Sequence, residues 1–439
     1  MIVVNADILW LIFWQNAIDE QTARITRLHA ARTCSQVCHL WRTILVGSPL
    51  IWSRLLVISQ EFHPEWINEV LRRSSSSPLW VDILLSYYER TEGLKHLLIM
   101  AFNIILRDNW KRLHTLDMTL LGPFQDVLTV HDWTPFFQPA PMLRSCSVMA
   151  TFPYLGPPKY RPVFSNNAPF LRTFRSNFLP IPQAAAAVRQ MRDLTFYEGD
   201  VGGVLRSLRS MPYLEKLVIH WKSNIQDSHS FHEVVKLPFL NHLETTTSVN
   251  VLVALLDGLS ILPFTLRIIN CVLRIQHLSL PTLDSNSLRE RMERLVKSHG
   301  QSGVPVPELC HLHLTFNYNG LKLVMDPSFT LEVFTNFLIQ DKADATNLVN
   351  AFKLRKLSEI TFLVLRVSES DHYYTSLTPL LTLMYSVTTL DVLETFFPVA
   401  NLEADHGDDE VVLFPQLHTL CIDRILLFKH QLRLVTCTQ

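Results

Sequence analysis

The hydrophobic residues follow a helical spacing near the N-terminus and a strand-like spacing beyond residue 110. In residues 5–18, NADILWLIFWQNAI, apolar side chains recur at i, i+1, i+4 and i+5, the stripe of an amphipathic helix. The stripe residues are Ile8, Leu9, Ile12 and Phe13. Asn5 is suited to cap this helix, and Asp7 is favourable in its first turn.

A second helical pattern covers residues 26–45, TRLHAARTCSQVCHLWRTIL. Its expected face consists of Leu28, Ala31, Cys34, Cys38, Trp41 and Leu45, with Val37 and Ile44 beside it. Gly47 should end the helix, and Ser48-Pro49 should begin a short third one. Three short helices bury too little surface to be stable alone. The segment therefore reads as a docking module that packs against a partner.

Three pieces of this segment together resemble the F-box. They are Ile8-Leu9 with Ile12-Phe13, then Val37-Cys38 with Trp41-Arg42-Thr43-Ile44-Leu45, then Ser48-Pro49-Leu50-Ile51-Trp52. The resemblance covers about residues 4–56 and is greatest to F-box proteins of mushroom-forming fungi, in which a Ser-rich link and a strand commonly follow, as at Ser74–Ser86 here. It implies a three-helix domain that docks on the Skp-family linker of a cullin-RING ubiquitin ligase.

The resemblance also implies which residues contact the linker. They are Ile8, Leu9, Ile12, Phe13, Val37, Trp41, Ile44, Pro49, Leu50 and Trp52. The family usually opens with Leu-Pro, where Val4-Asn5 stand in this chain. Loss of the proline removes a rigid helix start. A protein-interaction scaffold with a degenerate F-box and no ligase role is therefore the alternative.

From residue 110 onward, the pattern P-x-L-x-x-Φ-x-Φ recurs, where Φ is apolar; examples are PMLRSCSV from residue 141 and PYLEKLVI from residue 212. Its leading apolar residues are Leu113, Leu143, Leu171, Met191, Leu214, Leu240, Leu266, Leu309, Leu357, Val387 and Leu417. Most of these are 20–30 residues apart, near the period of leucine-rich repeats. The predicted fold class is α/β: a small three-helix F-box, then an irregular leucine-rich-repeat solenoid of parallel strands with helical returns. A single compact α/β domain is the alternative.

The expected domains are residues 1–58 as the F-box, 59–108 as a linker with a first strand and helix, and 109–439 as the solenoid. Two long intervals, after Leu266 and Leu309, leave room for added helices. We expect one at residues 286–300, which carry a capping box and a terminal glycine. A weaker helical pattern covers residues 329–341.

Strand residues alternate between faces, so those between the inward positions should line the concave surface of the solenoid. They include Arg175, Tyr197, Lys216, His220, His242, Glu244, His311 and His313, together with Asp117 and Asp391. This set mixes both charge signs with neutral polar groups. It predicts a protein target held by a few aromatic and charged anchors.

Composition narrows the class of protein. Hydrophobic residues make up 48% of the 439 residues and charged residues 18%, which excludes a mainly disordered chain. Lys+Arg, at 39, nearly balance Asp+Glu, at 40, so no global field favours nucleic acid or an anionic membrane. The N-terminus lacks the features of a signal peptide, and the apolar run 249–264 is interrupted by Asp257 and Pro263.

Candidate chemistry is sparse. Seven cysteines without a CxxC pair indicate reduced thiols and a cytoplasmic or nuclear protein. Cys34, Cys38 and His39 do not share one helical face, so we expect the two cysteines to pack against other side chains rather than to bind zinc. His311 and His313 share one face of a strand and could begin a metal site, but surface histidines on a binding face are the favoured interpretation. The acidic run 403–410 lacks the ligand spacing of a calcium loop. No nucleotide-binding, hydrolase or metalloprotease motif appears.

These observations predict a non-catalytic substrate adaptor without cofactor or metal. Its expected partners are the Skp-family linker, the cullin complex and an unidentified protein substrate, and neither nucleic acid nor a membrane is expected. An enzyme with an unrecognised site is the remaining alternative.

Overall fold

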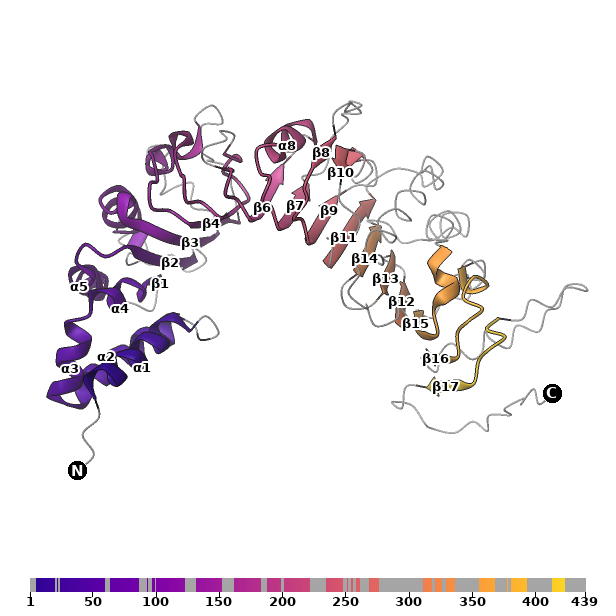
Figure 1. Cartoon of the computed structure of the whole chain (residues 1–439), viewed down its shortest axis with the longest axis horizontal. Helices are drawn as coiled ribbons and strands as arrows, with labels where there is room; N and C mark the ends of the chain where they lie inside the picture. Colours follow the sequence, from indigo (N-terminus) through magenta and orange to yellow (C-terminus); the bar gives the residue numbers. More distant parts are fainter. Residues whose placement is uncertain are drawn as a thin grey trace, which may run out of the picture. The chain divides into compact units, whose positions relative to one another are not determined.

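The structure, a computed structural model, has two compact units. The first consists of Met1–Leu240 with Gly258–Ser260, and the second of Asn241–Asp257 with Ile261–Gln439. The residues it describes are 5–19, 22, 24–59, 64–86, 93, 97–98, 100–122, 132–151, 162–182, 188–198, 201–221, 234–247, 251, 254–255, 258–260, 268–275, 311–317, 320–325, 329–335, 355–367, 377, 380–392 and 413–422. Figure 1 follows the chain through both units, which are considered one at a time below.

The first unit begins with four helices: α1 (Ala6–Ile18), α2 (Arg24–Val37), α3 (His39–Val46) and α4 (Pro49–Ser53). The predicted cap is confirmed, because the Asn5 Oδ1 atom accepts a hydrogen bond from the Asp7 N–H at 2.8 Å. Pro49 lies at the start of α4, as predicted.

The single helix predicted for residues 26–45 is wrong, because Cys38 is extended, with φ −156° and ψ 171°, and separates α2 from α3. Two side chains satisfy carbonyl groups at the end of α2. Ser35 Oγ donates to the Arg32 carbonyl at 2.6 Å, and Arg42 Nε donates to the Ser35 carbonyl at 3.1 Å. Val37 and Cys38 also have low helix propensity, so this is where the helix ends at least cost.

A parallel sheet follows in sequence order. It consists of β1 (Leu56–Ser59), β2 (Leu79–Ser86), β3 (Leu113–Leu121), β4 (Ser145–Ala150), β5 (Thr173–Ser176), β6 (Asp193–Glu198) and β7 (Lys216–Trp221). One continuous register row is Val81, Leu116, Cys146, Phe174, Leu194 and Leu217, all buried. Except for Val218 of β7, which is also buried, the residues on either side of this row are half-buried or exposed, which is the alternation predicted from the repeat.

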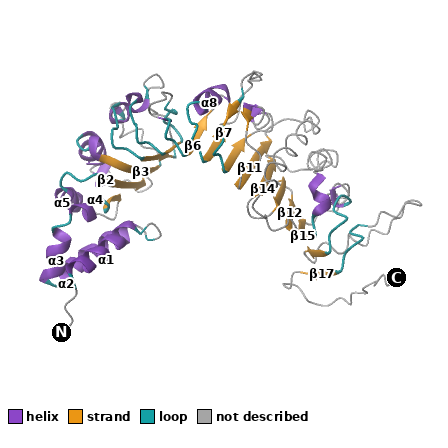
Figure 2. Cartoon of the chain, in the orientation of Figure 1, coloured by secondary structure: helices purple, strands orange, loops and turns teal. Residues whose placement is uncertain are grey.

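The described segments that return between these strands are a mixture of helices and short turns. They are α5 (Pro64–Ser74), the π-helix η1 (Met100–Arg107), the 3₁₀ turns η2 (Trp110–Arg112), η4 (Thr134–Phe137) and η5 (Val163–Asn166), and α8 (Val201–Leu208). Aromatic residues of η2, η4 and η5 pack against one another. The ring centroid of Trp110 lies 5.4 Å from that of Phe136 and 6.1 Å from that of Phe164. Short strands β8 (Val235–Lys236) and β10 (Leu259–Ser260) pair in parallel. In Figure 2, loops drawn in teal therefore provide much of the return path that was expected to be helical.

The second unit contains β9 (His242–Thr247), β11 (Ile268–Ile275), β12 (His311–Asn317), β13 (Gly320–Met325), β14 (Phe329–Thr335), η7 (Arg355–Glu359), β15 (Phe362–Val367), β16 (Thr389–Val392) and β17 (Thr419–Ile422). β9, β11 and β14 run parallel, as do β12, β15, β16 and β17. Between these groups, β13 pairs antiparallel with both β12 and β14.

The helix predicted at residues 329–341 is therefore wrong over Phe329–Thr335, which form β14. The long interval after Leu309 contains two added strands, stabilised by pairing with β11 and β12. Asn319-Gly320, a common hairpin dipeptide, was the sequence signal for this insertion. The predicted helix at 286–300 lies outside the described residues. The chain is an α/β protein with N-terminal helices and a mainly parallel, leucine-rich-repeat-type sheet, as predicted.

Candidate partner-binding surfaces

Helix α1 is apolar on more than one face. Leu9, Phe13 and Ala17, spaced by four residues, are buried against the rest of the first unit. Three other aliphatic side chains of α1 remain more than half exposed: Ile8 at 53%, Leu11 at 57% and Ile12 at 56%. The internal packing of the unit therefore uses only one of the two apolar faces.

The following helices also expose large aliphatic side chains. Together with those of α1 they form what we call the aliphatic set: Ile8, Leu11, Ile12, Val37, Leu40, Val46 and Leu50. All belong to α1–α4 of the first unit. Exposed aliphatic residues gathered on a few short helices are typical of a protein-interaction site rather than of an ordinary soluble surface.

The structure divides the ten residues predicted to contact a linker into three groups. Ile8, Ile12, Val37 and Leu50 are exposed, and Trp41, Ile44 and Pro49 are half-buried. Leu9, Phe13 and Trp52 are buried within the first unit, where they pack against other residues of the chain. Sequence reasoning missed Leu11, Leu40 and Val46. The unbroken apolar run of residues 8–14 was the signal that a second face of α1 would be apolar.

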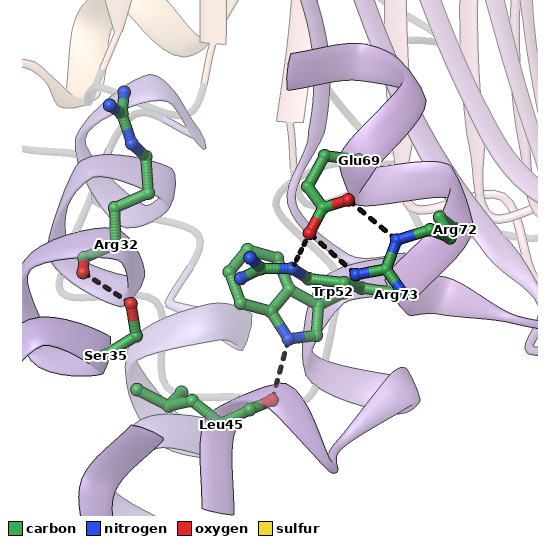
Figure 3. A network of polar contacts seen from close by, with 7 residues as sticks. All are labelled: Arg32, Ser35, Leu45, Trp52, Glu69, Arg72 and Arg73. Atoms are coloured by element: carbon green, nitrogen blue, oxygen red, sulfur yellow. Dashed lines mark hydrogen bonds and ion pairs between the residues drawn. The ribbon is translucent and has the colours of Figure 1, made fainter. Parts of the chain in front are cut away.

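Trp52 instead joins α4 to α5 (Figure 3). Its side chain is 0% exposed, and its indole N–H donates to the Leu45 carbonyl at 2.7 Å. The Arg73 guanidinium lies over the indole ring, 4.3 Å from its centroid. Glu69 holds Arg73 there by an ion pair of 2.7 Å and binds Arg72 at the same distance. The hydrogen bond from Arg72, followed by Arg73, lowers the pKa of Glu69 to about 2.

A stack of rings and cations joins α1 to the start of the sheet. Trp10 and Trp14 are stacked, with centroids 5.6 Å apart. The Arg54 guanidinium lies over Trp14 at 4.8 Å and over Trp80 at 3.9 Å. The His114 ring packs against Trp80 with centroids 4.4 Å apart. Cation–π contacts of this kind fix the position of α1 relative to β2 and β3 within the first unit.

Among the residues predicted to bind a target, the structure forms pairs rather than one cluster. In the first unit, Arg175 binds Asp193 of the next strand at 2.6 Å, and Tyr197 stacks on His220 with centroids 4.5 Å apart. Lys216 is half-buried at the start of β7.

In the second unit, His242 lies 3.6 Å from Glu244, and Arg366 binds Asp391 at 3.1 Å. His311 and His313 occupy alternate positions of β12, opposite Phe362 and Val364. Their side chains lie outside the described part of the structure.

The cysteines that precede α3 do not form the packed face that was predicted. Cys38 is exposed and Cys34 is half-buried, and only Cys146, on β4, is fully buried among the four described. Burial raises the pKa of the Cys146 and Cys34 thiols. Within the described residues, no three His, Cys, Asp or Glu side chains are grouped to hold a metal ion. Nor does any helix in those residues have the length and apolar character needed to cross a membrane.

Comparisons with known proteins add little to these observations. No model of a known protein family matches the chain, and no curated protein matches it. One similar solved structure is the leucine-rich repeat-containing protein LegL7 from Legionella pneumophila, with 9% identity and a TM-score of 0.23 over 89% of this chain and 86% of that one. The leucine-rich-repeat architecture is therefore argued from the strand register described above.

Proposed function

We propose that this protein is a non-catalytic adaptor that docks on a Skp-family linker of a cullin-RING ubiquitin ligase and presents a target protein bound to its repeats. The observation that carries the proposal is the aliphatic set on α1–α4. It coincides with the segment whose residues resemble the F-box. Such an adaptor acts by proximity, since two binding surfaces on one chain raise the local concentration of the target near the ubiquitin-charged enzyme.

The aliphatic set contributes nothing evident to the stability of the free chain. Leu9, Phe13, Leu45 and Trp52 already supply the buried anchors of the helices. Burial of apolar surface stabilises a complex by about 25 cal/mol per Å², so exposed Ile8, Leu11 and Ile12 would gain most from a partner. A largely apolar linker surface is the complement that this predicts.

The alternative is a repeat scaffold whose F-box has degenerated at Val4-Asn5. The side chain of Asn5 argues for the adaptor, because it caps α1 through the Asp7 N–H and so begins the helix without a proline. The adaptor is expected in the cytoplasm or nucleus, where such ligases act.

Titration of the full chain with a purified Skp-family linker tests the proposal. We expect binding with a micromolar or lower dissociation constant, and a loss of about a hundredfold in the double variant Ile12→Asp/Leu50→Asp, since each substitution removes an apolar contact and buries a charge. The matched control is Leu84→Asp/Val234→Asp, which changes two exposed aliphatic residues of the same unit outside α1–α4. It should bind within about threefold of the parent.

Two results would contradict the adaptor. One is the absence of binding by the parent chain at about 10 µM linker, which would favour the scaffold. The other is equal weakening by both double variants, which would show that the aliphatic set is not the contact surface. Circular dichroism of each variant would verify that α1–α4 remain folded.

A further inference from the structure

The strands of the first unit begin with the same turn, which places one residue of each repeat in a row along the sheet edge. The Arg144 N–H donates to the His114 carbonyl, and the Arg172 N–H donates to the Arg144 carbonyl, both at 2.8 Å. The Arg192 N–H donates to the Arg172 carbonyl at 2.8 Å, and the Glu215 N–H to the Arg192 carbonyl at the same distance. Neighbouring members are thus about 4.8 Å apart, the spacing of paired strands.

Three successive members of this row are arginines, and two of them have no ionic partner among the described residues. Arg192 forms an ion pair with Glu215. Arg144 and Arg172 are exposed, and neither guanidinium makes a hydrogen bond or ion pair with any residue that the structure describes. Like charges placed side by side on neighbouring strands destabilise a sheet. Folding alone therefore gives no reason for this arrangement.

His114 lies at the end of the row, where it is affected by the charge of Arg144. Its pKa is lowered to about 4, first by burial and then by the charges of Arg144 and Arg54. With this pKa the imidazole is neutral at physiological pH, so the positive charge along the row is that of the arginines.

A second row of exposed side chains accompanies the arginines. Two positions before Arg144, Arg172 and Glu215 stand Met142, Phe170 and Tyr213. Phe170 is 49% exposed and Tyr213 is 47% exposed, whereas the residue between each pair, such as Leu143 or Leu171, is buried. In two successive repeats, Met142 with Arg144 and Phe170 with Arg172, the edge thus presents a large apolar and a cationic side chain on either side of a buried one.

We propose that this edge, lined by Met142, Arg144, Phe170, Arg172, Arg192 and Tyr213, binds an extended acidic segment of another protein in which anionic and apolar side chains alternate. A guanidinium binds a carboxylate or phosphate through two parallel hydrogen bonds, so Arg144 and Arg172 supply two anion sites on adjacent strands. The exposed rings receive the apolar side chains between them. The anion is an Asp or Glu carboxylate or a phosphorylated residue.

Charge placement favours an acidic peptide over a nucleic acid. The positive stretch is short, because Glu215 neutralises Arg192 and Asp193 neutralises Arg175 beside it. A nucleic acid carries a charge at every nucleotide and would meet these carboxylates as well as exposed Asp117. A peptide needs only two anions at the unpaired arginines. The inference does not depend on linker binding.

The proposed binding of an acidic segment is tested by fluorescence anisotropy with the full chain and without any linker present. The probe is a labelled peptide in which Glu alternates with Leu, and a second probe carries phosphoserine in place of Glu. We expect one or both to bind, and Arg144→Glu/Arg172→Glu to weaken binding by about tenfold or more. The control Arg206→Glu/Lys236→Glu makes the same charge change at exposed residues of α8 and β8 and should leave binding unchanged.

The variant Arg144→Lys/Arg172→Lys keeps the charge but loses the paired hydrogen bonds, so we expect intermediate affinity. Phe170→Ser should also weaken the Glu–Leu probe without altering its salt dependence, because it removes no charge. Preference for Glu or for phosphoserine would identify the anion, and either supports the proposal. It is overturned if both probes bind equally to the parent and to the charge-reversed variant, if a Lys–Leu peptide binds as well, or if only oligothymidine or anionic vesicles bind at these arginines.

Discussion

Helices α1–α4 and strands β2–β7 of the same unit differ in how completely their apolar side chains are buried. Each strand buries its alternate apolar side chains in rows such as Val81, Leu116 and Cys146. The helices bury Leu9, Phe13 and Trp52 yet leave Ile12 and Leu50 exposed. The core face of the sheet is covered within the chain, whereas the helices carry more apolar surface than the chain covers. The difference indicates that the helices, but not the core face of the sheet, are built to receive a partner.

The largest expected effect distinguishes buried residues that stabilise the first unit, such as Trp52, from exposed residues proposed to contact a partner, such as Ile12. We expect Trp52→Ala to lower the free energy of unfolding of the first unit by about 3–5 kcal/mol, because it leaves a cavity and removes both the bond to Leu45 and the contact with Arg73. Ile12→Asp, an exposed change, should alter it by no more than about 0.5 kcal/mol. Denaturant unfolding followed by circular dichroism measures both. Similar losses would show that Ile12 is also an anchor.

Two cysteines allow the same comparison between a buried and an exposed residue, with a smaller expected loss of stability. Cys146 is buried in the central row of the sheet, so Cys146→Ser should cost about 1–3 kcal/mol for a hydroxyl placed among apolar side chains. Cys38→Ser, at the exposed break between α2 and α3, should cost less than about 0.5 kcal/mol. In the native protein, a thiol reagent should modify Cys38 rapidly and Cys146 only after unfolding, since burial also raises the pKa of the Cys146 thiol. Rapid modification of Cys146 would contradict its burial.

The smallest effect is expected from pH at the edge of the sheet. The pKa of His114 is about 4 in the folded chain, below the ordinary value of 6.5, so the unfolded chain binds more protons between these values. This contribution to stability is therefore complete above pH 6.5 and is lost progressively as the pH falls toward 4. His114→Gln should flatten that part of a plot of unfolding midpoint against pH. An unchanged slope would mean that other groups dominate.

Much of this architecture follows from local pattern. The repeat P-x-L-x-x-Φ-x-Φ located the strands of the first unit, because inward residues must alternate and recur in each repeat. The cap at Asn5 was likewise predictable from its side chain and position. The break at Cys38 and the hairpin of β13 and β14 were not predicted, since both depend on groups brought together by folding: Arg42 with the Ser35 carbonyl, and β14 with β11.

The candidate sites were predictable only in part. The resemblance to the F-box implied Ile8, Ile12, Val37 and Leu50 as linker contacts, and the structure shows that these four side chains are exposed. The resemblance also implied Trp52 as a contact, but Trp52 is buried and packs against Arg73 of α5. The arginines at the sheet edge precede the strand positions assumed to bind a target, so their common row was not predicted.

The sequence by itself determined the apolar periodicities, the parallel repeat and the apolar character of α1, because these depend on side-chain spacing along one chain. The tertiary structure decided which of those apolar residues are covered and which cations stand side by side. Leu9 and Ile12 are alike in hydrophobicity and lie on one helix, yet Leu9 is buried and Ile12 is more than half exposed. Arg144 and Arg172 are 28 residues apart in sequence and become adjacent only through the bond between their main chains. The exposure of the aliphatic set and the adjacency of the arginines are both consequences of the packed fold, and the two proposed surfaces depend on them.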